Sequence, residues 1–136
     1  MLKRNCALVK LELGENRLGP RCCRAFGEGL QTNATLKALS LESNPLTNES
    51  TDQTGVVALA RALATNATLT LLNLWRCDVG GAAGAELARA LQANATLVDL
   101  DVGNNGVSQA DKRRLADKID ANKRETKVLW RCVLWG

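Results

Sequence analysis

The chain has 136 residues, of which 46% are hydrophobic, and a formal net charge of +4. This length predicts a single domain with enough apolar residues for a continuous core. The absence of histidine argues against a zinc site and against a histidine-based catalytic centre. The basic excess lies toward the two ends of the chain rather than in one stripe with stacking aromatic residues, so we expect no nucleic-acid partner.

A recurring four-residue motif, Asn-Ala-Thr-Leu, divides the chain into units. It begins at Asn33, Asn66 and Asn94, with a degraded copy at Asn5 and a truncated copy at Asn122. The periods between these positions are 28, 33, 28 and 28 residues. A period of this size predicts a solenoid, in which each unit stacks only on its neighbours. We therefore predict one repeat domain over residues 1–136, with about four and a half repeats.

The residues that follow each Asn predict short parallel strands. In the first four units, Leu or Val recurs 3, 6 and 8 residues after the Asn, and Asn or Cys recurs 11 residues after it. This is the pattern L-x-x-L-x-L-x-x-(N/C)-x-L. We predict strands near residues 10–14, 38–42, 71–75, 99–103 and 127–131. In the recurring polar column, Asn16, Asn44 and Asn105 should be buried and bonded to backbone groups of the turn, and Cys77 takes this place once.

The second half of each unit predicts a helix. Leu87, Ala88 and Leu91 are spaced along one helical face, and the other units repeat this spacing. We predict helices near residues 20–32, 55–65, 82–93 and 109–121. The Asn after each helix is expected to adopt the left-handed conformation that ends helices.

The longer second period indicates an insertion between a strand and a helix. The extra residues fall within 47–54, a wholly polar stretch. We predict a protruding surface loop at the carboxyl edge of the sheet, where repeat proteins vary and often bind. A binding loop and a solvated insertion without function both fit this composition.

The 28-residue period, the full helix and the A-L-x-x-N-x-T-L junction resemble the ribonuclease-inhibitor class of leucine-rich repeats, most closely the repeats of NOD-like receptors. The class also includes tropomodulin and Ran GTPase-activating protein. The resemblance implies an α/β solenoid wound as a right-handed superhelix, with a parallel sheet on the concave side and helices on the convex side. It implies binding as the class of function and leaves the partner open, because members of the class differ in activity.

We therefore predict a non-catalytic protein-binding module in the cytoplasm, with no cofactor and no metal. The acids Asp99 and Asp101 alternate outward on one strand without the pocket that an acid–base pair needs. The sequence shows no signal peptide and no apolar run long enough to cross a bilayer, so we expect no membrane partner. Five cysteines without a C-x-x-C pair predict reduced thiols, with one of Cys22 and Cys23 facing inward.

Two alternative functions stay open. One is regulation of an enzyme in trans, of the GTPase-activating type, which would require side chains such as Arg17 and Arg76 at the strand-to-helix rim. The other is a cytoskeletal or ciliary scaffold.

The outward strand positions form columns that would make a binding surface on the concave face. The predicted partner-binding residues are Trp75, Leu71, Asn73, Glu42, Asp99, Asp101 and Arg131. Trp75 would stand near the centre among carboxylates, as in a hot spot for a partner that carries Arg or Lys. The alternative is that Trp75 only packs across the sheet onto the stems of Glu42 and Arg131.

The ends of a solenoid need polar caps. Val128 and Trp130 are expected to face inward in a closing half-repeat, and only four residues precede Asn5. We therefore predict either a piece of a longer array or self-association through the solenoid ends, because an exposed edge strand invites pairing.

Overall fold

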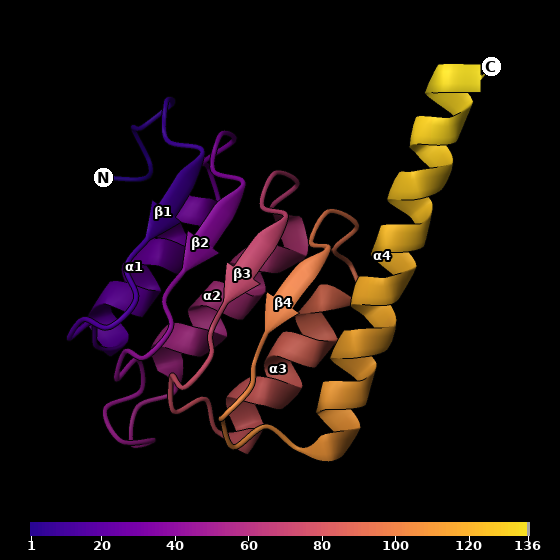
Figure 1. Ribbon diagram of the computed structural model, residues 1–136. Coiled ribbons are helices and arrows are strands. Elements are labelled where there is room, and N and C mark those ends of the chain that lie inside the picture. The colour runs from indigo at the N-terminus through magenta and orange to yellow at the C-terminus, as the bar shows by residue number, and fades with distance from the viewer. Residues whose placement is uncertain (136) are drawn as a thin grey trace.

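The computed structural model describes the backbone of residues 1–135 and the side chains of residues 1–129. Over this range four strands alternate with four helices (Figure 1). The strands are β1 (Lys10–Glu12), β2 (Ala38–Ser40), β3 (Leu71–Asn73) and β4 (Asp99–Asp101). The helices are α1 (Pro20–Leu30), α2 (Thr54–Thr65), α3 (Gly81–Leu91) and α4 (Gln109–Trp135). The strands pair in parallel in the order β1-β2-β3-β4, which confirms the predicted α/β repeat architecture.

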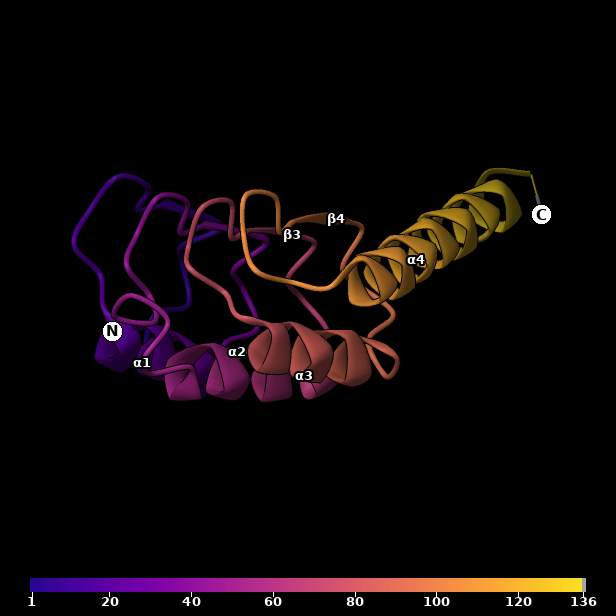
Figure 2. The ribbon, with the colours of Figure 1, turned by 90° about the horizontal axis from the view of Figure 1, so that it is seen from below.

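The core lies between the sheet and the helices. Figure 2 shows α1, α2 and α3 in one layer and the strands in the other. Alternate strand residues point toward the helices, so Leu39 and Leu72 at the centre of β2 and β3 are fully buried. Leu11 and Leu100 occupy the same position in β1 and β4 and are only half-buried, because each lies at an edge of the sheet.

The predicted fifth strand at residues 127–131 is wrong. Helix α4 continues through this stretch and projects beyond the stacked coils (Figures 1 and 2). Val128 and Leu129 do not close the core, since 59% and 66% of their surfaces are exposed. Trp130 and Arg131 have helical backbone, and their side chains lie outside the described residues.

The residues after Asn122 explain why the helix does not end there. In the complete repeats the junction Asn is followed by Ala-Thr-Leu, and that Leu is buried. After Asn122 come Lys123, Arg124 and Glu125, which are all good helix formers. Glu125 stands where the core leucine would be needed, and a carboxylate without a partner is costly to bury. Leaving the helix after Asn122 would therefore bury no apolar side chain at this core position.

The Asn that begins each repeat bonds adjacent coils together. It does not adopt the predicted left-handed conformation; Asn66, for example, is extended, with φ −68° and ψ 125°. Its Nδ2 donates to the carbonyl oxygens of Leu30 and Asn33 in the preceding coil, at 2.8 and 3.2 Å. Its Oδ1 accepts hydrogen bonds from the backbone N–H groups of Thr68 and Leu69, at 3.1 and 2.8 Å. We call this column, which the neighbouring repeats continue, the junction ladder.

A second column, the turn ladder, lies where the chain leaves each strand. Asn44 is buried, and its Nδ2 donates to the carbonyl oxygen of Leu13 at 2.8 Å. Its Oδ1 accepts from the backbone N–H groups of Asn16 and Leu18, both at 3.1 Å. Asn105 makes the equivalent bonds to the third coil. The predicted side-chain bonding is confirmed, but of the three only Asn44 is buried. Asn105 is half-buried, and Asn16 is exposed because it belongs to the coil at the edge of the stack.

Each turn also contains a residue with positive φ directly before the ladder position. These residues are Glu15, Ser43, Arg76 and Asn104, with φ between 52° and 56°. Only Asn104 is of a type that tolerates this conformation well. In the other three, the backbone N–H donates to a carbonyl oxygen of the next coil, and this bond helps to hold the conformation.

The insertion at residues 47–54 packs against the next coil more closely than predicted. Thr47 is fully buried, and its Oγ1 donates to the carbonyl oxygen of Asp78 at 2.9 Å. Gln53 donates to the same oxygen at 3.2 Å and accepts from the backbone N–H of Gly80 at 3.0 Å. Only the tip protrudes, and there three successive residues have positive φ. The loop is therefore anchored to the third repeat.

The cysteines whose side chains are described form a buried pair and an exposed pair. Cys77 lies in the turn ladder, where its Sγ donates to the carbonyl oxygen of Leu41 at 3.1 Å. Burial raises the pKa of Cys77 to about 11 and that of Cys23 to about 12. Cys6 and Cys22 are exposed.

We expect a thiol reagent at pH 8 to modify Cys6 and Cys22 rapidly and to spare Cys23 and Cys77 until the protein unfolds, because only the thiolate reacts. Mass spectrometry of the labelled peptides measures the four rates. Labelling of native Cys77 as fast as that of Cys22 would contradict its place in the turn ladder.

Candidate functional site

The open, concave face of the sheet carries rows of side chains in register across the strands. The first row is Lys10, Ala38, Leu71 and Asp99, and the second is Glu12, Ser40, Asn73 and Asp101. This register agrees with the columns predicted from the repeat alignment for the first four strands. A third row follows the strand ends and consists of Gly14, Glu42, Trp75 and Gly103.

Trp75 stands just beyond the end of β3 and is 38% exposed, so it does not belong to the leucine core. Its indole lies over Gly103, where a Cβ atom would come within 2.9 Å of Trp75 Cδ1. The backbone N–H of Trp75 donates to Asn73 Oδ1 at 2.9 Å, which holds the start of the turn. The indole therefore contacts the glycine of the next coil, and about two fifths of the residue's surface is open to solvent.

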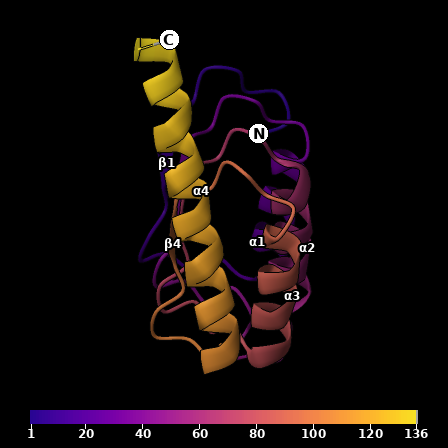
Figure 3. The ribbon, with the colours of Figure 1, turned by 90° about the vertical axis from the view of Figure 1, so that its right-hand side faces the viewer.

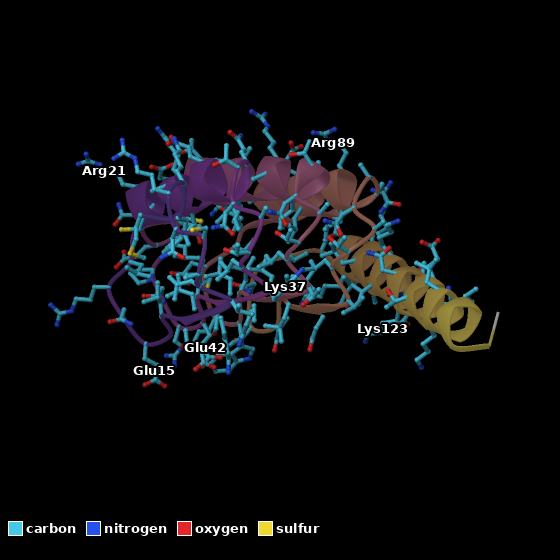
Figure 4. All side chains as sticks on the ribbon, turned by 90° about the horizontal axis from the view of Figure 1, so that it is seen from above. Glu15, Arg21, Lys37, Glu42, Arg89 and Lys123 are labelled. Carbon is cyan, nitrogen blue, oxygen red and sulfur yellow. The ribbon has the colours of Figure 1, made fainter. Side chains whose placement is uncertain are left out.

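Carboxylates lie on both sides of this tryptophan. Glu42, from the preceding coil, accepts a hydrogen bond from Asn73 Nδ2, and its Cγ is packed over Gly14. Asp99 and Asp101 of β4 are both exposed. Figure 4 shows Glu42 on the sheet side of the molecule, whereas Arg21 and Arg89 point outward from the helix side. The concave face thus combines an exposed aromatic ring with acidic groups on neighbouring strands.

A shallow groove of about 250 Å³ crosses the same face over β1, β2 and β3. Leu11, Ala38 and Leu71 form its apolar part, and all three are half-buried rather than fully exposed. The polar ends are Asn73 and Glu42 on one side and the Lys10–Glu12 ion pair, at 2.7 Å, on the other. A groove this open suits side chains of a protein partner better than an enclosed small molecule.

Six of the seven predicted binding residues lie on or at the end of strands of this face. Arg131 does not, because the strand that was to present it is part of α4. Because Gly103 has no side chain, Trp75 Cδ1 and Nε1 can approach its backbone closely. Aligning the repeats of the chain placed Gly103 beside Trp75, but it could not show that the indole would contact this glycine.

The rim arginines occupy a different hollow. Arg17 and Arg76 line a cavity of about 540 Å³ with Glu15 and Asp78, along the turn ladder. Two carboxylates accompany the two guanidinium groups there, so the hollow is close to neutral.

The described residues offer no cluster of three or more His, Cys, Asp and Glu side chains that could hold a metal ion. Among the helices of the same range, none is long and apolar enough to cross a membrane.

Comparison with known proteins agrees with this architecture. A family model described as "Leucine Rich repeat" matches residues 32–50. A solved structure of leiomodin-1 actin-binding site 2 is 27% identical with a TM-score of 0.78, and the match covers 99% of this chain and 76% of that chain. The tropomodulin C-terminal domain from Caenorhabditis elegans is 18% identical with a TM-score of 0.72, covering 86% and 68%. No curated protein matches the chain. With its period, ladders and parallel sheet, the chain is a leucine-rich repeat protein of the ribonuclease-inhibitor type.

Proposed function

We propose that the chain is a non-catalytic protein-binding module of the cytoplasm, and that its partner contacts the concave face around Trp75. The observation that carries this proposal is an exposed tryptophan next to Asp99 and Asp101, supported by the glycine beneath it. Tryptophan is enriched among the residues that dominate binding energy at protein interfaces. Acidic groups around it favour a partner that brings Arg or Lys to the ring.

Actin is the first partner to test. The likeness to an actin-binding site of leiomodin-1 extends over 99% of this chain at 27% identity. This likeness supports the cytoskeletal alternative over the GTPase-activating one, for which the arginines at the rim share their hollow with carboxylates. Co-sedimentation with filamentous actin, and fluorescence titration of monomeric actin, test both forms of the partner. The absence of binding to both would overturn the assignment of actin.

Trp75→Ala is expected to weaken partner binding by at least about 2 kcal/mol, or roughly thirtyfold in Kd, because it removes the aromatic anchor. The fold should persist, since the ring lies outside the core. Arg21→Ala, an exposed change on the helix side, is the matched control and should leave Kd unchanged. Equal affinities of the two variants would remove Trp75 from the proposed site.

A further inference from the structure

The sheet ends at β4 with an unused bonding edge. In the earlier coils, the carbonyl of the residue before each strand accepts from two N–H groups of the next coil: Thr70 O accepts from Val98 and Asp99, at 2.9 and 3.0 Å. Likewise, the backbone N–H of Leu74 donates to Asp101 O at 2.8 Å. The equivalent groups of the fourth coil are the carbonyl of Val98 and the backbone N–H of Val102. Between them lie the backbone N–H and carbonyl of Leu100. None of these has a backbone partner within the described part of the chain.

A groove of about 220 Å³ lies beside this edge, between β4 and α4. Figure 3 views the molecule from this end, with α4 in front, between the sheet and the helix layer. The apolar lining consists of Leu100 and Val102 from β4 and Leu115, Ala116 and Ile119 from α4. The charged residues at its margin are Asp99 from β4 and Lys112, Asp120 and Lys123 from α4. A strand added to β4 would therefore find backbone groups to bond on one side and apolar surface beneath it.

On the concave face of this edge, β4 itself presents only carboxylates, and the lysines of the groove, Lys112 and Lys123, belong to α4. Asp99 and Asp101 are exposed, and their neighbours in register on β3 are the uncharged Leu71 and Asn73. Neither carboxylate belongs to an ion pair among the described residues. A strand beside β4 would place its own outward side chains roughly 4.8 Å away. Opposite charges directly across adjacent strands are stabilising, so basic residues are favoured at these two positions.

We propose that the free edge of β4 receives an extended segment of a protein partner, which adds as a fifth parallel strand. The segment would carry an apolar residue facing the groove, flanked by Lys or Arg opposite Asp99 and Asp101. Parallel addition continues the bonding pattern of the three existing strand pairs. Recognition of this kind takes affinity from backbone bonds and specificity from alternate side chains. This surface shares Asp99 and Asp101 with the Trp75 surface, but its free backbone groups and its groove do not include Trp75.

The probe is a synthetic peptide that copies residues 5–18 with Cys6→Ser and Glu12→Lys, since this segment already has the repeat pattern with Lys10 outward. The control peptide keeps Glu12 and carries Lys10→Glu, which places carboxylates opposite Asp99 and Asp101. Calorimetric titration should give an affinity at least tenfold higher for the basic peptide. Equal affinities, or no binding of the basic peptide, would overturn the proposal.

Two variants of the protein locate the binding. Ala116→Trp fills the groove from an exposed helix position, and Ala110→Trp on the same helix, outside the groove, is its control. Val102→Pro removes one N–H of the free edge and leaves the bonds to β3 in place. Both edge variants should reduce peptide affinity at least tenfold, whereas the Ala110 variant should not. Unchanged affinity in Ala116→Trp would place the peptide elsewhere. Actin is absent from these titrations, so their outcome is separate from that of the proposed function.

Discussion

Gly55→Ala is expected to lower the free energy of unfolding by about 3 kcal/mol, because it forces two helices apart. A Cβ atom at Gly55 would lie 2.4 Å from the carbonyl oxygen of Pro20 and 2.9 Å from Cys23 Cβ. The first of these is backbone at the start of α1, which cannot rotate away as a side chain could. A second close approach, of Gly27 to the backbone of Ala58, prevents α2 from tilting to relieve the first.

Thermal unfolding followed by circular dichroism measures this effect, and a fall of about 10 °C in Tm is expected for a chain of this size. Gly81→Ala is the matched control. It also changes a glycine at the start of a helix, but the nearest atom to its added Cβ is 3.8 Å away. That variant should be neutral or slightly stabilised, because alanine restricts the unfolded chain. A Gly55 variant as stable as the Gly81 variant would show that α1 and α2 do not interlock.

The second large effect is expected at the junction ladder, where Asn94→Ala should cost about 3 kcal/mol. Asn94 is buried and has four bonding partners. Its Nδ2 donates to Leu63 O at 2.7 Å and Asn66 O at 3.2 Å, and its Oδ1 accepts from the N–H groups of Thr96 and Leu97. Truncation leaves buried backbone groups of two coils without partners.

Asn122→Ala tests the junction ladder at a position where only the Nδ2 group of the asparagine forms hydrogen bonds. Asn122 Nδ2 donates to Asn94 O at 3.1 Å and Leu97 O at 2.9 Å, but its buried Oδ1 has no partner, because the chain stays helical. Removing it also removes an unsatisfied acceptor, so the cost should be only about 1 kcal/mol. Urea unfolding midpoints of the two variants provide the comparison. Equal losses would mean that the oxygen side of the ladder contributes little.

The repeat made most of the fold predictable from sequence. Hydrophobic spacing located all four observed strands and the starts of all four observed helices to within about two residues. The register between neighbouring strands followed from aligning the repeats, because the strand residues lie at the same offsets from the junction Asn in each coil. The pairing of Leu71 with Asp99 is as predicted. The exposure of Trp75 also follows from the alignment, because it occupies an outward position in a pattern whose inward positions are leucine or valine.

The errors share one physical origin. A repeat pattern shows where apolar side chains recur, but not whether a segment is more stable as helix or strand, or which of two possible hydrogen-bonding roles a side chain takes. At residues 127–131 the apolar alternation fits a strand, but the polar helix formers before it keep the chain in α4. The junction Asn was predicted to end each helix in the left-handed conformation, because asparagine tolerates it. Instead, its side chain forms hydrogen bonds that join two coils. The contact of Gly55 with α1 is between helices, and no spacing within one helix reveals it.

The two ladders also have a direction. Asn33 and Asn44 of the second coil complete the backbone of the first, and Asn94 and Asn105 of the fourth complete that of the third. Each unit therefore carries the groups that its predecessor needs. Except between the second and third coils, where the 47–54 loop bonds to the next turn, a duplicated unit would bring its own donors and acceptors and would require no compensating change in the coils before it. Such an array can lengthen or shorten by whole units during evolution, while each inherited coil keeps the bonds that hold it.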